Sequence, residues 1–274
     1  MIKKIFLSFL LLILMAVGGI TAILIPAHQQ IDALNPPFPS LKSIRESAKI
    51  EGLPVSIEMF NTATQMVSKT SVLSSVKKDD AFEMSYPTFL ITWENGQQFL
   101  IDAGMTESVA LAFGKPLETL GAGAMKFHGD LKDFIDPSNI NGIGFTHLHE
   151  DHVDGVRTLC PAAKGLVVVQ GHEQFSQVNY GTSAQNELLD SLECGKRLLI
   201  RDDFTLKSIA GFPSLYLINV AGHTPGSQVF VVHVKVEGRN TTYILAGDLA
   251  NHIEGVESNT SKPVFYSRFI VPKI

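Results

Sequence analysis

The chain has 274 residues, of which 45% are hydrophobic and 18% are charged. This length and composition suit one large globular domain with a substantial core, or two small ones. The net charge is −5 and the lysines and arginines are scattered, so nothing in the sequence indicates a nucleic-acid surface. The oligomeric state is left open.

The first 27 residues form a separate segment. Lys3 and Lys4 precede an uncharged stretch from Ile5 to Ile25, which as a helix spans about 31 Å. Because this length is close to the hydrocarbon thickness of a bilayer, we expect residues 1–27 to be an uncleaved signal anchor. The protein would then be exported and membrane-anchored, on the periplasmic or extracellular face. The alternative is a signal peptide whose cleavage leaves a secreted protein.

The rest of the chain divides into a tether and a domain. Residues 28–51 are polar and contain prolines, which predicts a linker, and residues 52–274 are predicted to form one globular domain. Outside the cytosol, Cys160 and Cys194 could pair as a disulfide, because both lie in that domain. Two small buried cysteines with free thiols explain the sequence equally well.

Two predicted hairpins flank a region in which strands and helices alternate. The first spans 89–104, where Asn95-Gly96 indicates a type I′ turn, and the second spans 228–248 with its connection at 237–240. Between them, the hydrophobic pattern predicts helices at about 105–125, 129–135 and 187–192, and strands at 142–146, 165–170 and 215–220. This mixture predicts an α/β fold in which helices pack outside sheets that are not purely parallel.

A dense group of metal-binding residue types follows the strand predicted at 142–146. His147, His149, Asp151 and His152 form the pattern H-x-H-x-D-H. In an extended segment, residues i and i+2 point to the same side, so His147 and His149 can reach one ion together. Asp151 and His152 could hold the same ion or a neighbouring one. Imidazole and carboxylate ligands without a thiolate suit zinc, and also manganese or iron.

Two further motifs lie later in the chain. They are G-H-T-P-G-S, which contains His223, and a strand-ending G-D, which contains Asp248. Together with H-x-H-x-D-H, and in this order, they resemble the metallo-β-lactamase superfamily of hydrolases. The likeness covers about residues 53–250 and implies an αββα sandwich. It also implies that Asp102, in the L-I-D-A-G that ends the first hairpin, lies behind the metal ligands and supports them.

The resemblance implies a site in which six side chains bind two ions, with zinc as the expected metal. The ligands would be His147, His149 and His223 for the first ion, Asp151 and His152 for the second, and Asp248 as a bridge between them. A metal-bound hydroxide would attack the substrate while the second ion polarises the substrate oxygen. Asp151 is also the candidate catalytic residue, because it could orient the attacking water or carry its proton.

The C-terminus departs from the family pattern. The family usually supplies one more histidine to the second ion, whereas this chain ends at Ile274, 26 residues after Asp248. Three explanations stay open: the chain is shortened relative to its relatives, His252 substitutes, or the second ion binds weakly or not at all. For His252, the role of an ordinary polar loop residue is favoured. Without a further ligand, the second ion would still have Asp151, His152, Asp248 and a hydroxide.

The resemblance narrows the reaction without naming the substrate. A bridging aspartate is typical of the family's thioesterases, lactonases and phosphodiesterases, whereas true β-lactamases generally use another residue at that point. We therefore expect hydrolysis of a small ester, lactone or thioester. A phosphodiesterase or β-lactamase of the same fold is the alternative, and the absence of a basic patch near the motifs favours acyl chemistry. A hypothesis from another class is a membrane-tethered metal-binding protein with little activity.

Overall fold

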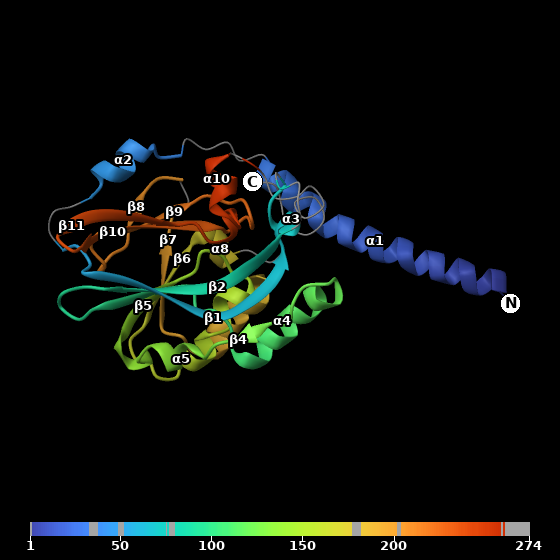
Figure 1. Cartoon of the computed structure of the whole chain (residues 1–274), viewed down its shortest axis with the longest axis horizontal. Helices are drawn as coiled ribbons and strands as arrows, with labels where there is room; N and C mark the ends of the chain where they lie inside the picture. Colours follow the sequence, from blue (N-terminus) through green and yellow to red (C-terminus); the bar gives the residue numbers. More distant parts are fainter. Residues whose placement is uncertain are drawn as a thin grey trace.

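The computed structural model describes residues 2–32, 38–48, 52–74, 76, 80–176, 182–201, 204–258 and 260. Two β-sheets pack face to face with helices outside them, and helix α1 (Ile2–Asp32) extends away from this body (Figure 1). The mixed α/β architecture with packed sheets that the motifs implied is therefore present.

The larger sheet carries both antiparallel and parallel strands, in the order β4-β1-β2-β3-β5-β6-β7. The strands are β1 (Ser56–Ser68), β2 (Ala81–Thr92), β3 (Gln98–Ile101), β4 (Lys126–Phe127), β5 (Ile140–Gly144), β6 (Val167–Gly171) and β7 (Lys196–Ile200). Strands β4, β1, β2 and β3 pair antiparallel, whereas β3, β5, β6 and β7 run parallel. The carboxyl ends of the parallel strands therefore meet at one edge, where α/β folds bind ligands.

The smaller sheet is antiparallel, in the order β11-β10-β9-β8. Its strands are β8 (Lys207–Ser208), β9 (Leu215–Asn219), β10 (Gln228–Val236) and β11 (Arg239–Leu245). Phe99 of the larger sheet and Phe230 of the smaller one are fully buried between the sheets, with ring centroids 6.3 Å apart. Gly144 permits this packing, because a Cβ there would lie 2.5 Å from the Phe230 ring.

Short helices cover the outer face of each sheet. They are α2 (Leu41–Glu46), α3 (Lys69–Val72), α4 (Glu107–Thr119), α5 (Leu131–Phe134), α6 (Glu150–Val153), α7 (Val156–Leu159), α8 (His172–Ser176), α9 (Thr182–Ser191) and α10 (Ile253–Glu257), with 3-10 turns at η1 (Pro137–Asn139) and η2 (Gly247–Leu249). Leu131 of α5, Leu159 of α7 and Leu188 of α9 share one core cluster with Leu100 of the larger sheet. Ile44 of α2 packs on the smaller sheet's outer face.

The predicted hairpins form, but their turns differ from expectation. The first connection is five residues long, 93–97, and only Gly96 has a positive φ (82°) there, so the type I′ turn predicted at Asn95-Gly96 is wrong. The two-residue turn with positive φ occurs in the second hairpin, at Glu237 (49°) and Gly238 (78°). The four-residue connection predicted there was therefore two residues too long.

Other predicted elements are present with shifted bounds. The helix predicted at 105–125 is α4, which ends at Thr119 and is followed by Gly121 with a φ of 99°. A glycine in this conformation commonly ends a helix, and it explains why the prediction ran too far. The strand predicted at 142–146 is β5, two residues earlier, so the histidine motif begins beyond the strand.

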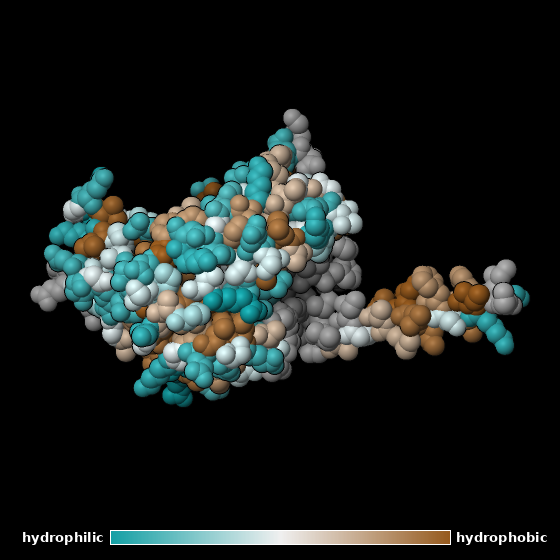
Figure 2. Space-filling model, turned by 90° about the horizontal axis from the view of Figure 1, so that it is seen from below, coloured by the Kyte–Doolittle hydropathy of each residue, from teal (hydrophilic) through white to brown (hydrophobic). Residues whose placement is uncertain are grey.

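Helix α1 contains the segment predicted as an anchor, and apolar side chains such as Ile5 and Leu14 lie exposed along it (Figure 2). Among the residues that the structure describes, however, no helix combines the length and the apolar character needed to cross a membrane. The membrane-spanning or signal helix predicted for residues 1–27 is therefore not supported. The domain boundaries at residues 27 and 51 stay predictions.

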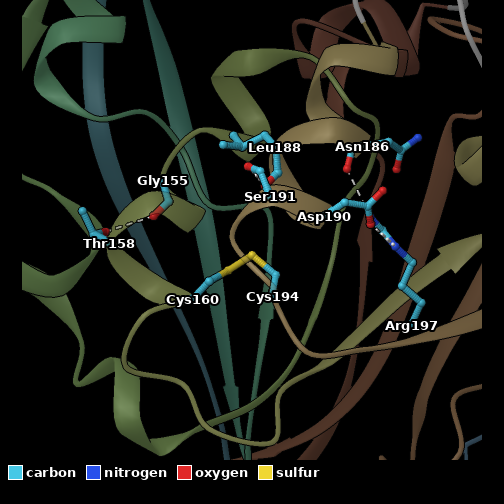
Figure 3. Close-up of a disulfide and its surroundings, with 9 residues drawn as sticks. All are labelled: Gly155, Thr158, Cys160, Asn186, Leu188, Asp190, Ser191, Cys194 and Arg197. Atoms are coloured by element: carbon cyan, nitrogen blue, oxygen red, sulfur yellow. Dashed lines mark hydrogen bonds and ion pairs between the residues drawn. A yellow bond between two sulfur atoms is a disulfide. The ribbon is translucent and has the colours of Figure 1, made fainter.

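Cys160 and Cys194 form a disulfide, which settles the alternative that the sequence left open (Figure 3). Cys160 follows helix α7, and Cys194 lies in the turn between α9 and β7. Both side chains are buried in the core cluster beneath the larger sheet. The crosslink thus fixes the helices that follow the histidine motif to the parallel strands.

The first testable prediction concerns this crosslink. For the observed sequence separation of 34 residues, the chain-entropy model gives a stabilisation of about 3–4 kcal/mol. We expect the Cys160→Ser, Cys194→Ser double variant to lose free energy of unfolding of this order, measured by urea denaturation. The parent in reductant should behave like the double variant. Two free thiols in the native, unreduced protein would contradict the assignment.

Candidate metal centre

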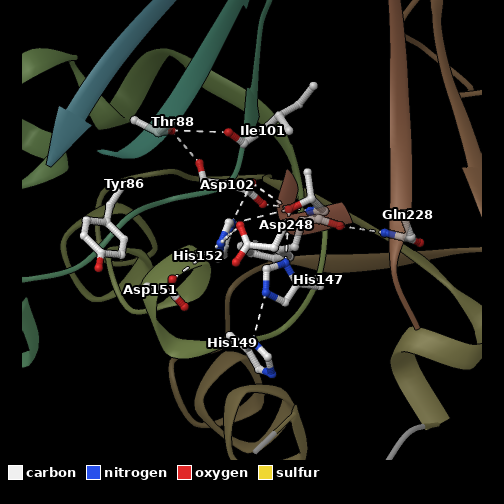
Figure 4. A network of polar contacts seen from close by, with 12 residues as sticks. Tyr86, Thr88, Ile101, Asp102, His147, His149, Asp151, His152, Gln228 and Asp248 are labelled. Atoms are coloured by element: carbon white, nitrogen blue, oxygen red, sulfur yellow. Dashed lines mark hydrogen bonds and ion pairs between the residues drawn. The ribbon is translucent and has the colours of Figure 1, made fainter. Parts of the chain in front are cut away.

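The predicted ligands gather at the edge where the parallel strands end (Figure 4). Strand β5 ends at Gly144, the backbone bends at Thr146 and His147, and it is extended again at His149, which caps helix α6 with φ −81° and ψ 157°. The rings of His147 and His149 have a centroid separation of 4.5 Å. A nitrogen of each ring therefore lies within reach of one point.

Three imidazole nitrogens form the first group. Nε2 of His147 and Nε2 of His223 each lie 3.0 Å from Nδ1 of His149. Two nitrogen ligands of a tetrahedral zinc ion, each about 2.0–2.1 Å from it, lie about 3.3 Å apart, close to these separations. Hydrogen bonds alone fit poorly, because one Nδ1 atom cannot donate a proton to one neighbour and accept from another. A shared cation would satisfy all three rings.

The second group adds a carboxylate and another imidazole. Ligand atoms of His147, Asp151 and His152 all lie within 4.8 Å of one another, so His147 borders both groups. Asp248, in the turn η2, presents one oxygen to each group. Its Oδ1 is 3.4 Å from Nε2 of His152, and its Oδ2 is 3.6 Å from Nε2 of His223. These positions suit a bridging carboxylate.

The surroundings of the Asp151 carboxylate are evidence for a cation site in the second group. Its Oδ1 is buried and has no hydrogen-bond partner among the residues that the structure describes. Burial raises the pKa of Asp151 to about 6, the charge of Asp248 also raises it, and His152 acts in the opposite direction. A buried carboxylate oxygen without a partner is costly, and a bound cation removes that cost.

Asp102 holds His152 in place, as the resemblance implied. Its Oδ2 lies 2.9 Å from Nδ1 of His152, while Thr146 donates to the same carboxylate through its backbone N–H (2.7 Å) and its hydroxyl (2.8 Å). Nε2 of His152 is thereby aimed at Asp151 and Asp248. A carboxylate behind a histidine is the usual support for a metal-binding imidazole.

The electrostatics of the group favour positive charge between the carboxylates. Burial opposes a charge on His152, but the carboxylates of Asp102 and Asp151 outweigh it and raise the pKa of His152 well above its usual range. Burial likewise opposes ionisation of Asp248, yet its contact with His152 and the nearby imidazoles hold its pKa well below the usual range. Burial, followed by the like charges of the other histidines, lowers the pKa of His147 well below its usual range. His147 and Asp248 are thus in the states that bind metal.

His252 lies outside both groups. Its Nδ1 accepts a hydrogen bond from the backbone N–H of Glu254 (3.0 Å), which caps α10, and its ring packs against Phe82 with centroids 5.2 Å apart. These contacts match the polar loop role rather than a substitute ligand. The C-terminal residues 261–274 lie outside the described part of the chain.

The structure has an open pocket of about 410 Å³ to which no sequence motif pointed. It lies beyond the carboxyl ends of β6 and β7, and its lining residues are His172, Glu173, Leu199, Ile200 and Arg201. None of the six predicted ligands lines it, so it is separate from the two metal-binding groups. Its only sequence signal is its place after two parallel strands.

Several solved structures of similar fold have TM-scores above one half. One is a mutant of AiiA from B. thuringiensis with N-decanoyl-L-homoserine at the active site, with 17% identity over 77% of this chain and 82% of that chain and a TM-score of 0.57. A second is an N-acyl homoserine lactone hydrolase with the product N-hexanoyl-L-homoserine at its catalytic metal centre (17% identity, 77% and 82% coverage, TM-score 0.56). A quorum-quenching N-acyl homoserine lactone lactonase gives 16% identity, 77% and 80% coverage and a TM-score of 0.55.

The chain matches one family model and no curated protein. A search of curated proteins finds no match. The model of the metallo-beta-lactamase superfamily matches residues 84–257, which is more than half of the chain and includes all six predicted ligands. With two packed sheets and a histidine–aspartate cluster at their edge, the chain belongs to the metallo-beta-lactamase superfamily.

Proposed function

We propose that the protein is a metal-dependent hydrolase of a small ester, lactone or thioester and that it holds two divalent ions. The proposed metal is zinc, and the proposed ligands are His147, His149, Asp151, His152, His223 and Asp248. The observation that carries the proposal is the position of Asp248, with one oxygen near each imidazole group. Bound divalent ions would lower the pKa of water and polarise a substrate oxygen, which is the chemistry that hydrolysis needs.

Asp151 has a second role in this proposal. Its Oδ1 is buried and has no hydrogen-bond partner among the described residues. A carboxylate oxygen with an open acceptor position can orient a water molecule and accept its proton. His152 does not share this task in the proposal, because its Nε2 is a proposed metal ligand and its Nδ1 is bonded to Asp102.

Acyl substrates are preferred over phosphodiesters and β-lactams. The aspartate at the bridging position is the pattern expected of the family's ester-type hydrolases, and two of the similar structures described above are an N-acyl homoserine lactone hydrolase and an N-acyl homoserine lactone lactonase. The pocket beyond β6 and β7 offers Leu199 and Ile200 to an apolar part of a substrate and Arg201 to a polar group. A small acyl compound that extends along the strand ends fits these surroundings.

Export is part of the proposal. The Cys160–Cys194 disulfide is of the kind that persists in oxidising compartments such as the periplasm or the extracellular space. Lys3 and Lys4, followed by an apolar segment, are consistent with an export signal. Fractionation of cells that express the full chain would test this, and recovery with the thiols reduced in the cytosol would contradict it.

The function is tested by metal content and by a panel of substrates. We expect about two zinc ions per chain and turnover of activated esters and lactones that a chelator removes and zinc restores. Asp248→Ala should lose at least one ion and its turnover, because the bridge between the groups is gone. Glu254→Ala, in nearby α10, is the control and should retain both. If only phosphodiesters or β-lactams are turned over, the proposed substrate class is wrong. If the protein binds metal but turns over no substrate, it is a metal-binding protein and the proposed hydrolase function is wrong.

A further prediction concerns Asp102 and His152. Asp102→Ala should lower the affinity for the second ion by about 10–100-fold, because Nδ1 of His152 loses the carboxylate that orients the ring. Asp154→Ala is the matched control: Asp154 is also 2% exposed, but it accepts from Thr106 and Arg157 and contacts no predicted ligand. Competition with a chromophoric chelator would measure the affinity. Equal affinities in the two variants would argue against the support role.

The pH dependence of metal binding follows from the same contacts. In the metal-free protein His152 keeps its proton up to its raised pKa, and the second ion must displace that proton. The affinity of this ion should therefore rise by about tenfold per pH unit across the neutral range. Below the pKa of Asp151, about 6, the slope should steepen, since a second proton is displaced. A flat titration between pH 6 and 8, in zinc competition experiments, would contradict the assignment of His152.

A further inference from the structure

Two buried glutamines lie behind the histidines, and no sequence motif pointed to them. Gln174 belongs to the short helix α8 and is 2% exposed, and Gln228 is the first residue of strand β10 and is fully buried. Buried side-chain amides are retained where their hydrogen bonds are satisfied, so the partners of these two show what they hold together.

The Gln174 amide joins the two chain segments that carry the first group of imidazoles. Its Nε2 donates to the carbonyl oxygen of Phe145 (2.9 Å) and to that of Gly226 (3.2 Å). Phe145 lies two residues before His147, and Gly226 lies three residues after His223. A single NH₂ group therefore bridges segments that are far apart in the sequence but meet at the candidate metal centre.

The packing around this bridge is close. A Cβ on Gly226 would lie only 2.5 Å from Cα of Gln174, so the loop rests directly on the α8 backbone. Gln228 closes the arrangement, because its Nε2 donates to Phe145 (2.8 Å) and its backbone N–H to Thr146 (2.7 Å) (Figure 4). The loop after β9, which carries His223, is thereby tied to the segment after β5.

We propose that Gln174 is a positioning residue that sets the distance between His223 and His149, and so the geometry of the first metal-binding group. His223 lies in a loop between β9 and β10, whereas His149 begins helix α6, and no strand pairing joins the two. The bridge from Gln174 adds to the bonds of Gln228 a direct link between the His223 loop and the segment before His147. The inference rests on the proposed function for the statement that the first group binds a metal ion. The placement of the His223 loop rests on the hydrogen bonds alone.

The test compares two variants that remove the same kind of bond. Gln174→Met keeps a side chain of similar length and removes both donors. Gln65→Met is the matched control, because Gln65 is 1% exposed and its Nε2 also donates to two carbonyls, of Gly114 (3.1 Å) and Gly123 (2.9 Å). The two variants should lose similar thermal stability, since each removes two hydrogen bonds that a buried amide donates.

Two measurements separate positioning from stability. In the metal-free full chain, hydrogen exchange followed by mass spectrometry should be faster over residues 220–228 in Gln174→Met and unchanged there in Gln65→Met. Cobalt(II), titrated as a spectroscopic probe, should bind the first group of Gln174→Met about 10–100-fold more weakly, with an altered absorption spectrum. Gly226→Ala, which pushes the loop away from α8, should show the same pattern if Gln174→Met does not fold.

The outcomes distinguish this inference from the proposed function. If hydrogen exchange over residues 220–228 is the same in Gln174→Met and Gln65→Met, the positioning role is overturned, whatever the metal content of the variants. A parent that binds no cobalt or zinc would overturn the proposed function, while the exchange measurement still decides the role of Gln174.

Discussion

The candidate site depends on the parallel pairing of strands β3 and β5. This pairing places Ile101 opposite Gly144 and continues into the loops, where the backbone N–H of Asp102 donates to the Gly144 carbonyl (2.9 Å). Asp102 then accepts both polar hydrogens of Thr146. Because His147 follows Thr146 directly, the strand pairing determines where the histidine motif starts.

The packing of the two sheets reinforces this constraint. Gly144 leaves room for the Phe230 ring of the opposite sheet, and a larger residue would push β5 away from that sheet. On its outer side the larger sheet is held by the disulfide-linked helices. The motif is thus fixed on one side by the core between the sheets and on the other by the helix layer. Rigid supports of this kind keep ligands within the small tolerance that metal binding allows.

The cluster of charges also links metal binding to folding. Asp102, Asp151 and His152 are buried at less than one tenth exposure, and Asp151 has a carboxylate oxygen without a hydrogen-bond partner. Burial of such groups is unfavourable unless opposite charge compensates it. Protonated His152 supplies part of that charge in the metal-free protein, and divalent ions would supply more. An ion that binds only the folded chain stabilises it by mass action.

The parts of the site that follow local chemistry could be predicted from the sequence. H-x-H-x-D-H identifies ligand types by its spacing, and the alternation of hairpins and helices indicates packed sheets. The ligand role of His223 was implied by the resemblance to the superfamily. Gln174 and Gln228 could not be predicted, because their roles depend on carbonyl groups brought together only by folding.

The turn at Asn95 was missed because the preference of Asn-Gly for a two-residue turn gave way to the length of the strands, which leaves five residues in the connection. The end of α4 was missed because the hydrophobic pattern continues past Gly121, whose backbone conformation ends the helix. The disulfide was undecided because spacing along the chain says nothing about distance in space. The anchor at residues 1–27 was inferred from length and hydropathy alone, and the described helices do not support it.

The most direct test of the central claim is anomalous diffraction at the zinc edge from crystals of the zinc-loaded protein. The account predicts two peaks about 3.5–4 Å apart. One should lie among the nitrogens of His147, His149 and His223, and the other beside Asp151 and His152, with Asp248 between them. A single peak, or peaks away from these side chains, would contradict the dinuclear site.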